Sequence, residues 1–425
     1  MVTAIKGEKK LKSAGLQPEK RKKIQRQKDL FQADTYSIWA AMILLVAFGL
    51  MMIYSASGYR FAGSSAHGYD SMYLLKRQII FAGAGVAACF FGQYLNYRLL
   101  NKKIFAVAIY IVGIASVLLL KTSLGVSANG ATRWLNIAGI QFQVAEIVKI
   151  CVIVMLAYLL QKHLKRMNTG ELIIRAWLTG SLAAILLLTI SNDLSSSLVV
   201  LGITYGITFV YTRTEKLHYT LAGGAIATVA TYIWYLKNHM PSEFELEKMS
   251  FRVGRIAAWI DPERYANNQG YQTLQALYAI GSGGIWGKGL GSSTQKLSAI
   301  PEAQNDMIFS IICEELGLAG AMILVVLIVF LCYELFKIAI SAQDLFGSVL
   351  ATGVLIHMGF QSFVNIGVNV NLLPNTGIGL PFISYGGTAV FCQLAEIAIV
   401  LSVGRVALGF EFLGMKKKVR IGNEQ

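Results

Sequence analysis

Apolar runs separated by short polar links make up most of the sequence. About ten of these runs approach the length of about 17 to 25 residues that a helix needs to cross the hydrocarbon core of a bilayer. The predicted spans cover residues 37–55, 79–95, 104–120, 144–161, 176–190, 196–211, 217–236, 316–336, 345–365 and 386–406. The pattern therefore predicts an all-α integral membrane protein with about ten transmembrane helices.

Positively charged side chains indicate the orientation of these spans. Ten Lys or Arg residues lie between Lys6 and Lys28, ahead of the first span. Further basic residues occupy the C-terminal tail and the links near residues 100, 165, 214 and 340. Because Lys and Arg are concentrated on the cytoplasmic side of a membrane, we expect both termini to be cytoplasmic and the number of spans to be even.

This orientation divides the chain into three parts. Residues 1–34 are expected to form a basic, solvated cytoplasmic tail without helical amphipathic order. Residues 35–408 form the membrane domain, in which 237–305 is a large extracellular loop between the seventh and eighth helices. Residues 409–425 form a second basic cytoplasmic tail.

The composition excludes several classes of protein. Of the 425 residues, 55% are hydrophobic and only 14% are charged, which is far from the composition of a soluble domain. The net charge of +15 would suit nucleic acid, but much of it lies ahead of the first span, where an anionic inner leaflet attracts it. The five cysteines show no metal or disulfide spacing, and the five histidines form no cluster. No protein ligand set for a metal is therefore predicted, and a divalent cation such as Mg²⁺ or Mn²⁺ is left open as a cofactor.

Asp306 is the most prominent candidate for chemistry. It lies where a polar segment meets the eighth span, and a charge at a membrane edge is costly enough to suggest a function. Pro301 could initiate a helix and Asn305 could cap it, which would put Asp306 in the first turn, where the helix dipole favours an ionised carboxylate. Such a carboxylate can accept a proton, although Asp306 could equally be a residue at a helix start without a chemical role.

Glu314 and Glu315 lie deeper in the span. They could bond to buried backbone or to neighbouring helices, and this structural role is at least as well supported as a chemical one.

Further charged residues lie beside predicted helix starts. Arg133 precedes Glu146 and Lys149, which are three residues apart and hence adjacent on a helix. The Glu146–Lys149 pair is either a structural ion pair or the lining of a water-filled cavity that contacts an anionic substrate. Asp193 lies between two spans, where it either caps the second helix or contributes a site carboxylate.

The long external segment and the last polar link contain three more features. Residues 250–260 predict a short interfacial helix, on which Arg252 and Arg255 could grip a pyrophosphate or anchor lipid head groups. The glycine-rich run 281–291, which includes Lys288, lacks the spacing of a phosphate-binding loop but would permit either a tight irregular backbone or the close approach of a substrate. Residues 365–389, with two prolines and several glycines, predict a re-entrant loop that contains Ser384.

Several of these motifs resemble the SEDS family, which comprises FtsW, RodA and SpoVE. The resemblance rests on Pro301-Glu302-x-x-x-Asp306-x-Ile308-Phe309 with the following Glu314-Glu315-Leu316-Gly317, on Arg133-Trp134 with Glu146 and Lys149, and on the run from Leu373-Pro374 to Gly386-Gly387. It extends from the first predicted span to the last, and the glycine-rich run is most similar to the FtsW and SpoVE branch. The chain departs from the family pattern at three places. Val144-Ala145 replaces a usual Pro-Ser, Asn371 replaces a frequent Gly, and Asn375 replaces a frequent Thr.

The resemblance implies an activity and a set of partners. It implies a peptidoglycan glycosyltransferase of the bacterial cytoplasmic membrane, which polymerises lipid II on the outer face during division or related septal or spore wall synthesis. The reaction would invert the sugar, and undecaprenyl pyrophosphate would leave. The implied partners are a single-pass class B penicillin-binding transpeptidase and other division proteins, and no nucleic acid is expected.

The resemblance also implies roles for individual residues. Asp306 would be the catalytic base. The residues expected to bind the substrate are Arg133, Glu146, Lys149, Asp193, Arg252, Arg255, Lys288 and Ser384.

Two other functions fit the same residues. A lipid II flippase would use the intramembrane charges to line a translocation path, and it should carry functional polar residues on both leaflets and near the midplane. A non-catalytic scaffold for the wall-synthesis complex should tolerate the loss of Asp306. The candidate residues gather on the predicted outer face, which favours the enzyme.

Overall fold

The computed structural model describes residues 18–62, 70, 72–128, 131–163, 170–212, 214–242, 245–246, 249, 251–297, 300 and 303–407. Within the first of these ranges, side chains are described for residues 35–57.

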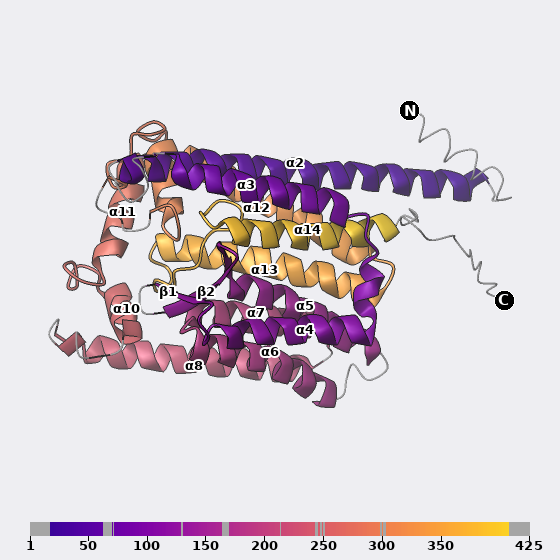
Figure 1. Ribbon diagram of the computed structural model, residues 1–425. Helices are drawn as coiled ribbons and strands as arrows, with labels where there is room; N and C mark the ends of the chain where they lie inside the picture. Colours follow the sequence, from indigo (N-terminus) through magenta and orange to yellow (C-terminus); the bar gives the residue numbers. More distant parts are fainter. Residues whose placement is uncertain are drawn as a thin grey trace.

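Within the described residues, ten long helices form the body of the protein and lie side by side (Figure 1). They are α2 (Pro18–Ala62), α3 (Tyr73–Gly92), α4 (Lys103–Leu119), α5 (Val144–Lys162), α6 (Gly170–Ile190), α7 (Leu194–Tyr211), α8 (Glu215–Asn238), α12 (Ile308–Ser341), α13 (Leu345–Asn369) and α14 (Gly387–Ala407). Each coincides with one predicted span. The all-α architecture predicted from the apolar runs is confirmed.

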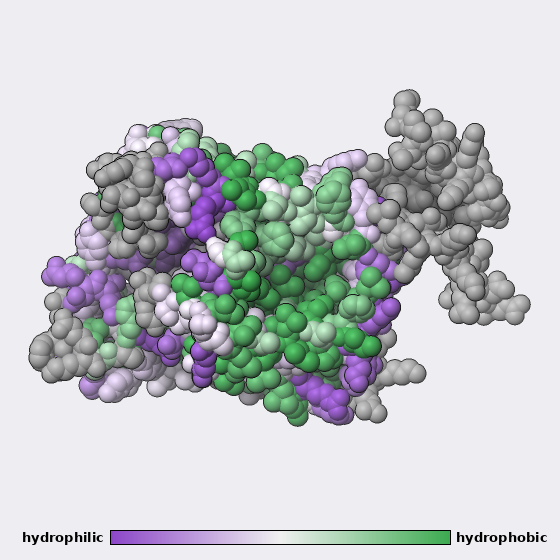
Figure 2. Space-filling model, in the orientation of Figure 1, coloured by the Kyte–Doolittle hydropathy of each residue, from purple (hydrophilic) through white to green (hydrophobic). Residues whose placement is uncertain are grey.

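The surface of this bundle matches a bilayer. Eight of the ten helices are long and apolar enough to cross a membrane, whereas α4 has 17 residues and α8 is long but less apolar. Hydrophobic residues cover the middle of the visible face in a broad band, and hydrophilic residues lie towards both ends of it (Figure 2). The protein is therefore a multi-pass membrane protein.

The start of α2 and the end of α14 lie at the same end of the bundle (Figure 1). The short helices α10 (Phe251–Ile260) and α11 (Tyr271–Gly283) lie at the opposite end. This arrangement agrees with an even number of crossings. By the positive-inside argument, the end with α10 and α11 is the outer end.

Several helix boundaries differ from the prediction because polar residues extend the helices beyond the apolar runs. Helix α2 begins at Pro18, inside the segment 1–34 that was expected to form a basic tail without helical amphipathic order. Helix α6 begins at Gly170, and Arg175 lies within it, where it pairs with Glu171 at 2.5 Å, one helical turn away. Hydropathy identifies the apolar part of a helix and cannot show that the helix continues into polar residues beyond it.

A small antiparallel sheet at the outer end was not predicted. It consists of β1 (Gly125–Ala128), β2 (Ala131–Ile137) and β3 (Ile140–Gln143), paired in the order β1-β2-β3. The tight turn between β2 and β3 uses Ala138 and Gly139, whose φ angles are 52° and 81°. A two-residue turn with two positive φ angles suits a hairpin, but Ala-Gly is not its usual sequence, and this pair therefore gave no turn signal.

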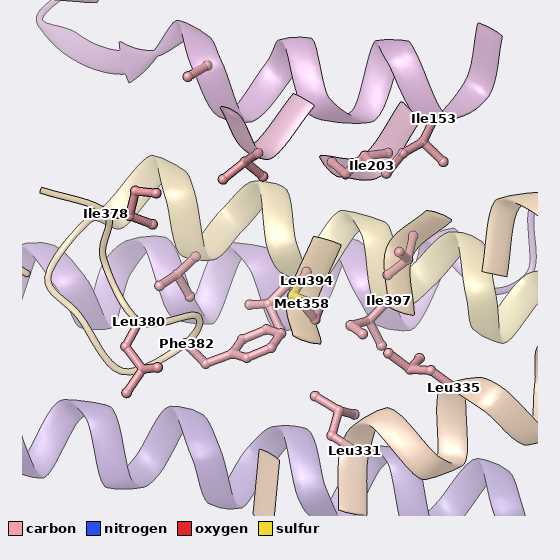
Figure 3. Close-up of a cluster of buried hydrophobic side chains, with 14 of the residues drawn as sticks. Ile153, Ile203, Leu331, Leu335, Met358, Ile378, Leu380, Phe382, Leu394 and Ile397 are labelled. Carbon is pink, nitrogen blue, oxygen red and sulfur yellow. The ribbon is translucent and has the colours of Figure 1, made fainter. Parts of the chain in front are cut away.

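Helix α13 is the centre of the fold and contacts α5, α7, α12 and α14. The loop between α13 and α14 turns back into this core. Figure 3 shows Phe382 of the loop pointing towards Met358 of α13 and Leu394 of α14, with Ile378 and Leu380 further along the same loop. All five side chains are at least 91% buried. The prediction of an irregular segment that returns into the bundle is thus confirmed.

One glycine of α2 makes room for this loop. A Cβ atom at Gly49 would overlap the carbonyl oxygen of Phe382, whereas one at Gly83 of α3 would meet nothing within 4 Å. We expect Gly49→Val to destabilise the protein by about 1 to 3 kcal/mol, because overpacking of a filled interface costs this much. Thermal unfolding in detergent measures the effect, with Gly83→Val as the matched control. Equal midpoints for the two variants would contradict this packing argument.

Candidate active site

Asp306 lies in a turn at the outer end of the bundle, ahead of α12. Residues 303–307 form successive turns, and α12 starts at Ile308 with Met307 as its N-cap. The prediction that Asn305 caps the helix and that Asp306 occupies its first turn is therefore wrong. Pro301, the expected initiator, lies outside the described residues. The helix starts later than predicted because the Asp306 carbonyl bonds to side chains of α13 rather than within α12.

Four charged side chains from four separate segments gather around this turn. Arg133 of β2 lies 3.9 Å from Asp193, measured from Nε to Oδ2, and Arg255 of α10 interacts electrostatically with Asp306, Asp193 and Arg133. We call these four residues the outer charge cluster. The structure brings together four of the nine predicted site residues, which are separated by as many as 173 positions in the chain (306 − 133 = 173).

Asp193 serves two purposes in this cluster. Its carboxylate caps α7 by accepting hydrogen bonds from the Ser196 amide at 3.0 Å and the Ser196 hydroxyl at 2.8 Å. The predicted capping role is thus confirmed, and the same carboxylate also faces Arg133. The Nε of Arg133 is buried and has no hydrogen-bond partner among the described residues. This guanidinium retains the capacity to bind an anion.

Burial lowers the pKa of Arg255, as does the nearby positive charge of Arg133, while Asp306 and Asp193 raise it. Arginine still remains protonated. A partly buried cation is screened less by water than an exposed one, so it attracts an additional anion more strongly. The site can therefore bind a negatively charged group next to a proton acceptor.

The re-entrant loop covers the Asp306 turn. Ser384 donates its hydroxyl to the Asn305 carbonyl at 2.5 Å and accepts the Leu380 amide at 2.7 Å. The Tyr385 amide donates to the Gln304 carbonyl at 2.9 Å. In this state the Ser384 hydroxyl joins the loop to the turn, a positioning role that the sequence prediction of substrate binding did not include.

The other side of the loop contacts α10 and α7. Arg255 donates to the Asn375 carbonyl at 3.3 Å, and the Ser195 hydroxyl donates to the Thr376 carbonyl. A Cβ atom at Gly377 would lie 3.7 Å from an Asp306 carboxylate oxygen. The loop backbone at residues 375–377 therefore forms one wall of the outer charge cluster.

Asn371 shows how the chain accommodates one departure from the family pattern. Its φ angle is 58°, in the left-handed region where glycine is favoured and asparagine is the best tolerated alternative. Its carbonyl accepts the Trp259 indole N–H at 3.0 Å. Asn371 thus preserves the backbone turn that a glycine would form.

Glu146 and Lys149 form a buried ion pair. The Lys149 ammonium lies 2.6 Å from Glu146 and also donates to Gln361 at 2.7 Å. Exposed fractions are 5% for Glu146 and 2% for Lys149, while the second Glu146 oxygen has no partner among the described residues. Of the two alternatives that the sequence left open, the structural ion pair is the one seen in this structure. A role in binding the substrate stays a prediction.

Lys288 belongs to a second group of charges, further along α12. Its ammonium lies 2.6 Å from Glu314, and Lys296 lies 2.6 Å from Glu315, which also accepts the Ser55 hydroxyl. We call these residues the glutamate anchor. It binds the glycine-rich run to α12 and to α2, so Glu314 and Glu315 have the structural role that the sequence suggested as an alternative.

The backbone of α12 is broken at this anchor. Gly317 has φ 68° and ψ −170°, and the freed backbone groups pair with the glycine-rich run. The Lys288 and Gly289 amides donate to the Glu314 and Glu315 carbonyls, each at 2.9 Å. The glycines of the run therefore form the tight irregular backbone that was one of the two predictions, and they allow the run to approach α12 closely. The approach of a substrate stays a prediction.

Arg252 is separated from the outer charge cluster. It is exposed, and the described part of the chain offers it no hydrogen bond or ion pair, whereas Arg255 packs against Phe251 and the loop. The predicted pairing of the two guanidiniums around one ligand is not seen in this state. Residues three apart lie about 60° apart around a helix, which is enough to turn one side chain inwards and the other to solvent.

Four buried polar residues of α13 were not predicted as part of the site. His357, Gln361, Asn365 and Asn369 are buried and lie at intervals of four. Asn365 and Asn369 both donate to the Asp306 carbonyl, at 2.8 and 2.9 Å. Their spacing was the available signal, because four polar residues on one face of an apolar span are costly unless each has a partner.

Fold and site together define a class of protein. It is a polytopic helical membrane protein with a partly buried cluster of two carboxylates and two guanidiniums at its outer end, covered by a re-entrant loop.

Comparisons identify the family. The model of the cell cycle protein family FtsW/RodA/SpoVE matches residues 35–407. This chain therefore belongs to the FtsW/RodA/SpoVE family, as its motifs indicated.

Individual relatives cover most of the chain. A probable peptidoglycan glycosyltransferase FtsW of Geobacter metallireducens is 34% identical over 366 residues, which is 85% of this chain and 92% of the relative. Stage V sporulation protein E of Bacillus subtilis is 32% identical over 370 residues, which is 85% of this chain and 94% of the relative. A chain of the solved structure "Structural coordination of polymerization and crosslinking by a peptidoglycan synthase complex" has a TM-score of 0.65 and 27% identity, with 86% of this chain and 97% of that chain covered.

Proposed function

We propose that this protein is a peptidoglycan glycosyltransferase that polymerises lipid II at the outer face of the cytoplasmic membrane. The observation that carries the proposal is the outer charge cluster, in which the carboxylate of Asp306 is close enough to the guanidinium of Arg255 for the two charges to attract each other. The names of the family members support the reaction class. A lipid-linked sugar pyrophosphate offers a hydroxyl that requires a base and a leaving group that requires cations.

Asp306 is the general base in this proposal. Its carboxylate takes the proton of the 4-hydroxyl on the acceptor GlcNAc, and the oxygen attacks C1 of the MurNAc on a second lipid-linked molecule. The C1–O bond to the pyrophosphate breaks with inversion, and undecaprenyl pyrophosphate leaves with the bonding electron pair. A positioned base of this kind contributes about 10² to 10⁴-fold to the rate.

Arg255 and Arg133 are the groups that stabilise the leaving pyrophosphate. Both belong to the outer charge cluster, and a guanidinium binds phosphate oxygens through paired hydrogen bonds. Negative charge increases on the pyrophosphate as the C1–O bond breaks. Preorganised cations in a desolvated site therefore lower the barrier.

No step of this proposal passes through a metal. No group of three or more His, Cys, Asp or Glu residues that could hold one occurs in the part of the chain that is described. Mg²⁺ characteristically binds to substrate phosphates with one or two carboxylates. If a divalent cation takes part, the pyrophosphate would be its main ligand.

The buried polar groups deeper in the bundle argue against the flippase alternative. Lys149, Glu146, Gln361 and His357 bond to one another, and none is more than 5% exposed. A translocation path should present polar groups to a passing head group. These groups are instead paired within the protein.

Polymerisation of lipid II by the purified protein in liposomes tests the proposal. We expect glycan strands from the wild type, supplied with its cognate transpeptidase if one is needed. Movement of labelled lipid II between leaflets without polymer would identify a flippase. Neither activity, with wall synthesis intact in an Asp306 variant, would identify a scaffold.

We also propose a single-pass class B penicillin-binding transpeptidase as a partner, together with other division proteins. The similarity to a chain of a peptidoglycan synthase complex supports a crosslinking partner. Co-purification of the two membrane proteins, followed by measurement of polymerisation with and without the partner, tests this association.

The two arginines of α10 provide a matched pair of variants. Arg255→Ala is expected to lower the rate of polymerisation about 10²-fold, because it removes a partly buried cation from the leaving group. Arg252→Ala should retain activity within about two-fold, since Arg252 is exposed on the same helix. Initial rates at saturating lipid II provide the comparison. Equal losses for the two variants would contradict the assignment.

A further inference from the structure

Four polar side chains form one stripe along α13. His357, Gln361, Asn365 and Asn369 follow one another at intervals of four, and their exposed fractions are 0%, 3%, 1% and 0%. We call them the α13 polar stripe. Burial of polar groups in a membrane helix is costly unless their hydrogen bonds are made. The partners of the stripe therefore indicate its purpose.

The outer half of the stripe holds the main chain of Asp306. The side-chain amides of Asn365 and Asn369 both donate to the Asp306 carbonyl, at 2.8 and 2.9 Å. A carbonyl oxygen has two lone pairs, and here two amides from adjacent turns of one helix use both. The oxygen of Asn369 in turn accepts the Ser310 amide at 3.1 Å and its hydroxyl at 2.6 Å. The Asp306 turn is thereby fixed to α13 and to the first turn of α12.

The middle of the stripe holds the re-entrant loop. Asn365 also donates to the Ile378 carbonyl at 2.7 Å, and Gln361 donates to the Gly379 carbonyl at 2.9 Å. The same Gln361 accepts Lys149 at 2.7 Å. The orientation of the Gln361 amide follows from these contacts, because its oxygen must face the ammonium and its NH₂ the carbonyl.

The inner end of the stripe completes the network. His357 Nε2 lies 2.9 Å from the Gln361 oxygen and must donate to it, while Nδ1 lies 2.7 Å from Glu396 of α14. The imidazole thus links the Glu396 carboxyl to Gln361 and holds the Gln361 side chain in place. A single helix face links the buried charges, the loop and the Asp306 turn.

We propose that Asn365 and Asn369 are positioning residues that aim the carboxylate of Asp306 at the acceptor hydroxyl. This inference rests on the proposed function. Asp306 precedes α12, and its carbonyl bonds to α13 tie its main chain directly to a helix of the core, so these bonds help to fix where its Cα lies. A displacement of about 1 Å in a reacting group can cost about 10²-fold in rate.

The test uses Asn369→Leu, which has a similar size but cannot donate to Asp306. The Ser310 amide keeps a second acceptor in this variant, the Met307 carbonyl at 3.2 Å. The matched control is Ser310→Ala, which removes the hydroxyl bond to Asn369 and leaves both bonds to Asp306 in place. Steady-state polymerisation of lipid II by the purified full-length protein is measured together with thermal unfolding.

We expect Asn369→Leu to lower kcat about 10- to 100-fold while KM for lipid II stays within about three-fold and the folded fraction is unchanged. Ser310→Ala should keep kcat within about two-fold. A purely structural role would lower the unfolding temperature and the folded fraction, and would leave kcat per folded molecule as in the wild type. That result, or an Asn369→Leu variant as active as the wild type, would overturn the positioning role.

A second variant keeps the test decisive if Asn369→Leu does not fold. Asn369→Ser is polar but too short to reach the Asp306 carbonyl, and the same criteria on kcat and KM apply to it. Absence of polymerisation by the wild type would overturn the proposed function and this inference with it. An active wild type with an equally active variant would overturn only the inference.

Discussion

Asp306→Asn is expected to abolish measurable polymerisation, with a loss of about 10² to 10⁴-fold in kcat. The substitution keeps the shape of the side chain and both backbone bonds from Asn365 and Asn369 to the carbonyl. It removes only the negative charge and the capacity to take a proton. A loss of activity without a loss of folding would therefore identify the carboxylate as the base.

The measurement is the rate of glycan strand formation from lipid II in liposomes. Asp70→Asn is the control, because Asp70 is also a carboxylate on a polar segment but pairs with Lys76 at 2.7 Å, away from the outer charge cluster. It should retain wild-type activity. Normal polymerisation by Asp306→Asn would refute the assigned role and favour a scaffold.

Lys149→Met is expected to give the largest loss of stability. The variant leaves Glu146, which is 5% exposed, without its partner. The carboxylate must then either stay charged in a buried place or take up a proton, and both cost free energy. Removal of one member of a buried ion pair costs about 3 to 5 kcal/mol. The loss of folded, monodisperse protein with increasing temperature in detergent provides the measurement.

Two further variants make this result specific. Lys162→Met changes an exposed lysine at the end of the same helix and should have little effect. The double variant Glu146→Gln with Lys149→Met removes both charges and should recover much of the lost stability, since neutral groups of similar size are often tolerated in place of a buried pair. A single variant as stable as the wild type would contradict the buried pair.

The sequence was sufficient to predict the bundle because a helix that spans a membrane needs a long run of apolar residues, and such runs can be recognised from residue type alone. Each apolar run became a helix, and the short helix at 250–260 was found from its two-sided pattern. Helix ends were predicted less well. The pattern could not show that α12 begins after Asp306 or breaks at Gly317, because both features depend on partners distant in the chain.

The candidate site was predicted in part. Asp306 was selected because a charge near a membrane span is costly, and Arg255 because a guanidinium can grip a pyrophosphate. Arg133 and Asp193 were selected mainly from the resemblance, and the structure brings all four together. Lys288 was selected from the glycine-rich run and the resemblance, yet it pairs with Glu314. Residue type tells us that a charge needs a partner, and only the fold tells us whether that partner is protein or substrate.

The glutamate anchor has a consequence for the order in which the protein matures during synthesis. Lys288 and Lys296 leave the ribosome before Glu314 and Glu315, and the four side chains form two ion pairs just ahead of the break at Gly317. The anchor can therefore close only after the first turns of α12 have been made and inserted. Until then the glycine-rich run has no binding surface, and the outer end of the protein is assembled after much of the bundle already spans the membrane.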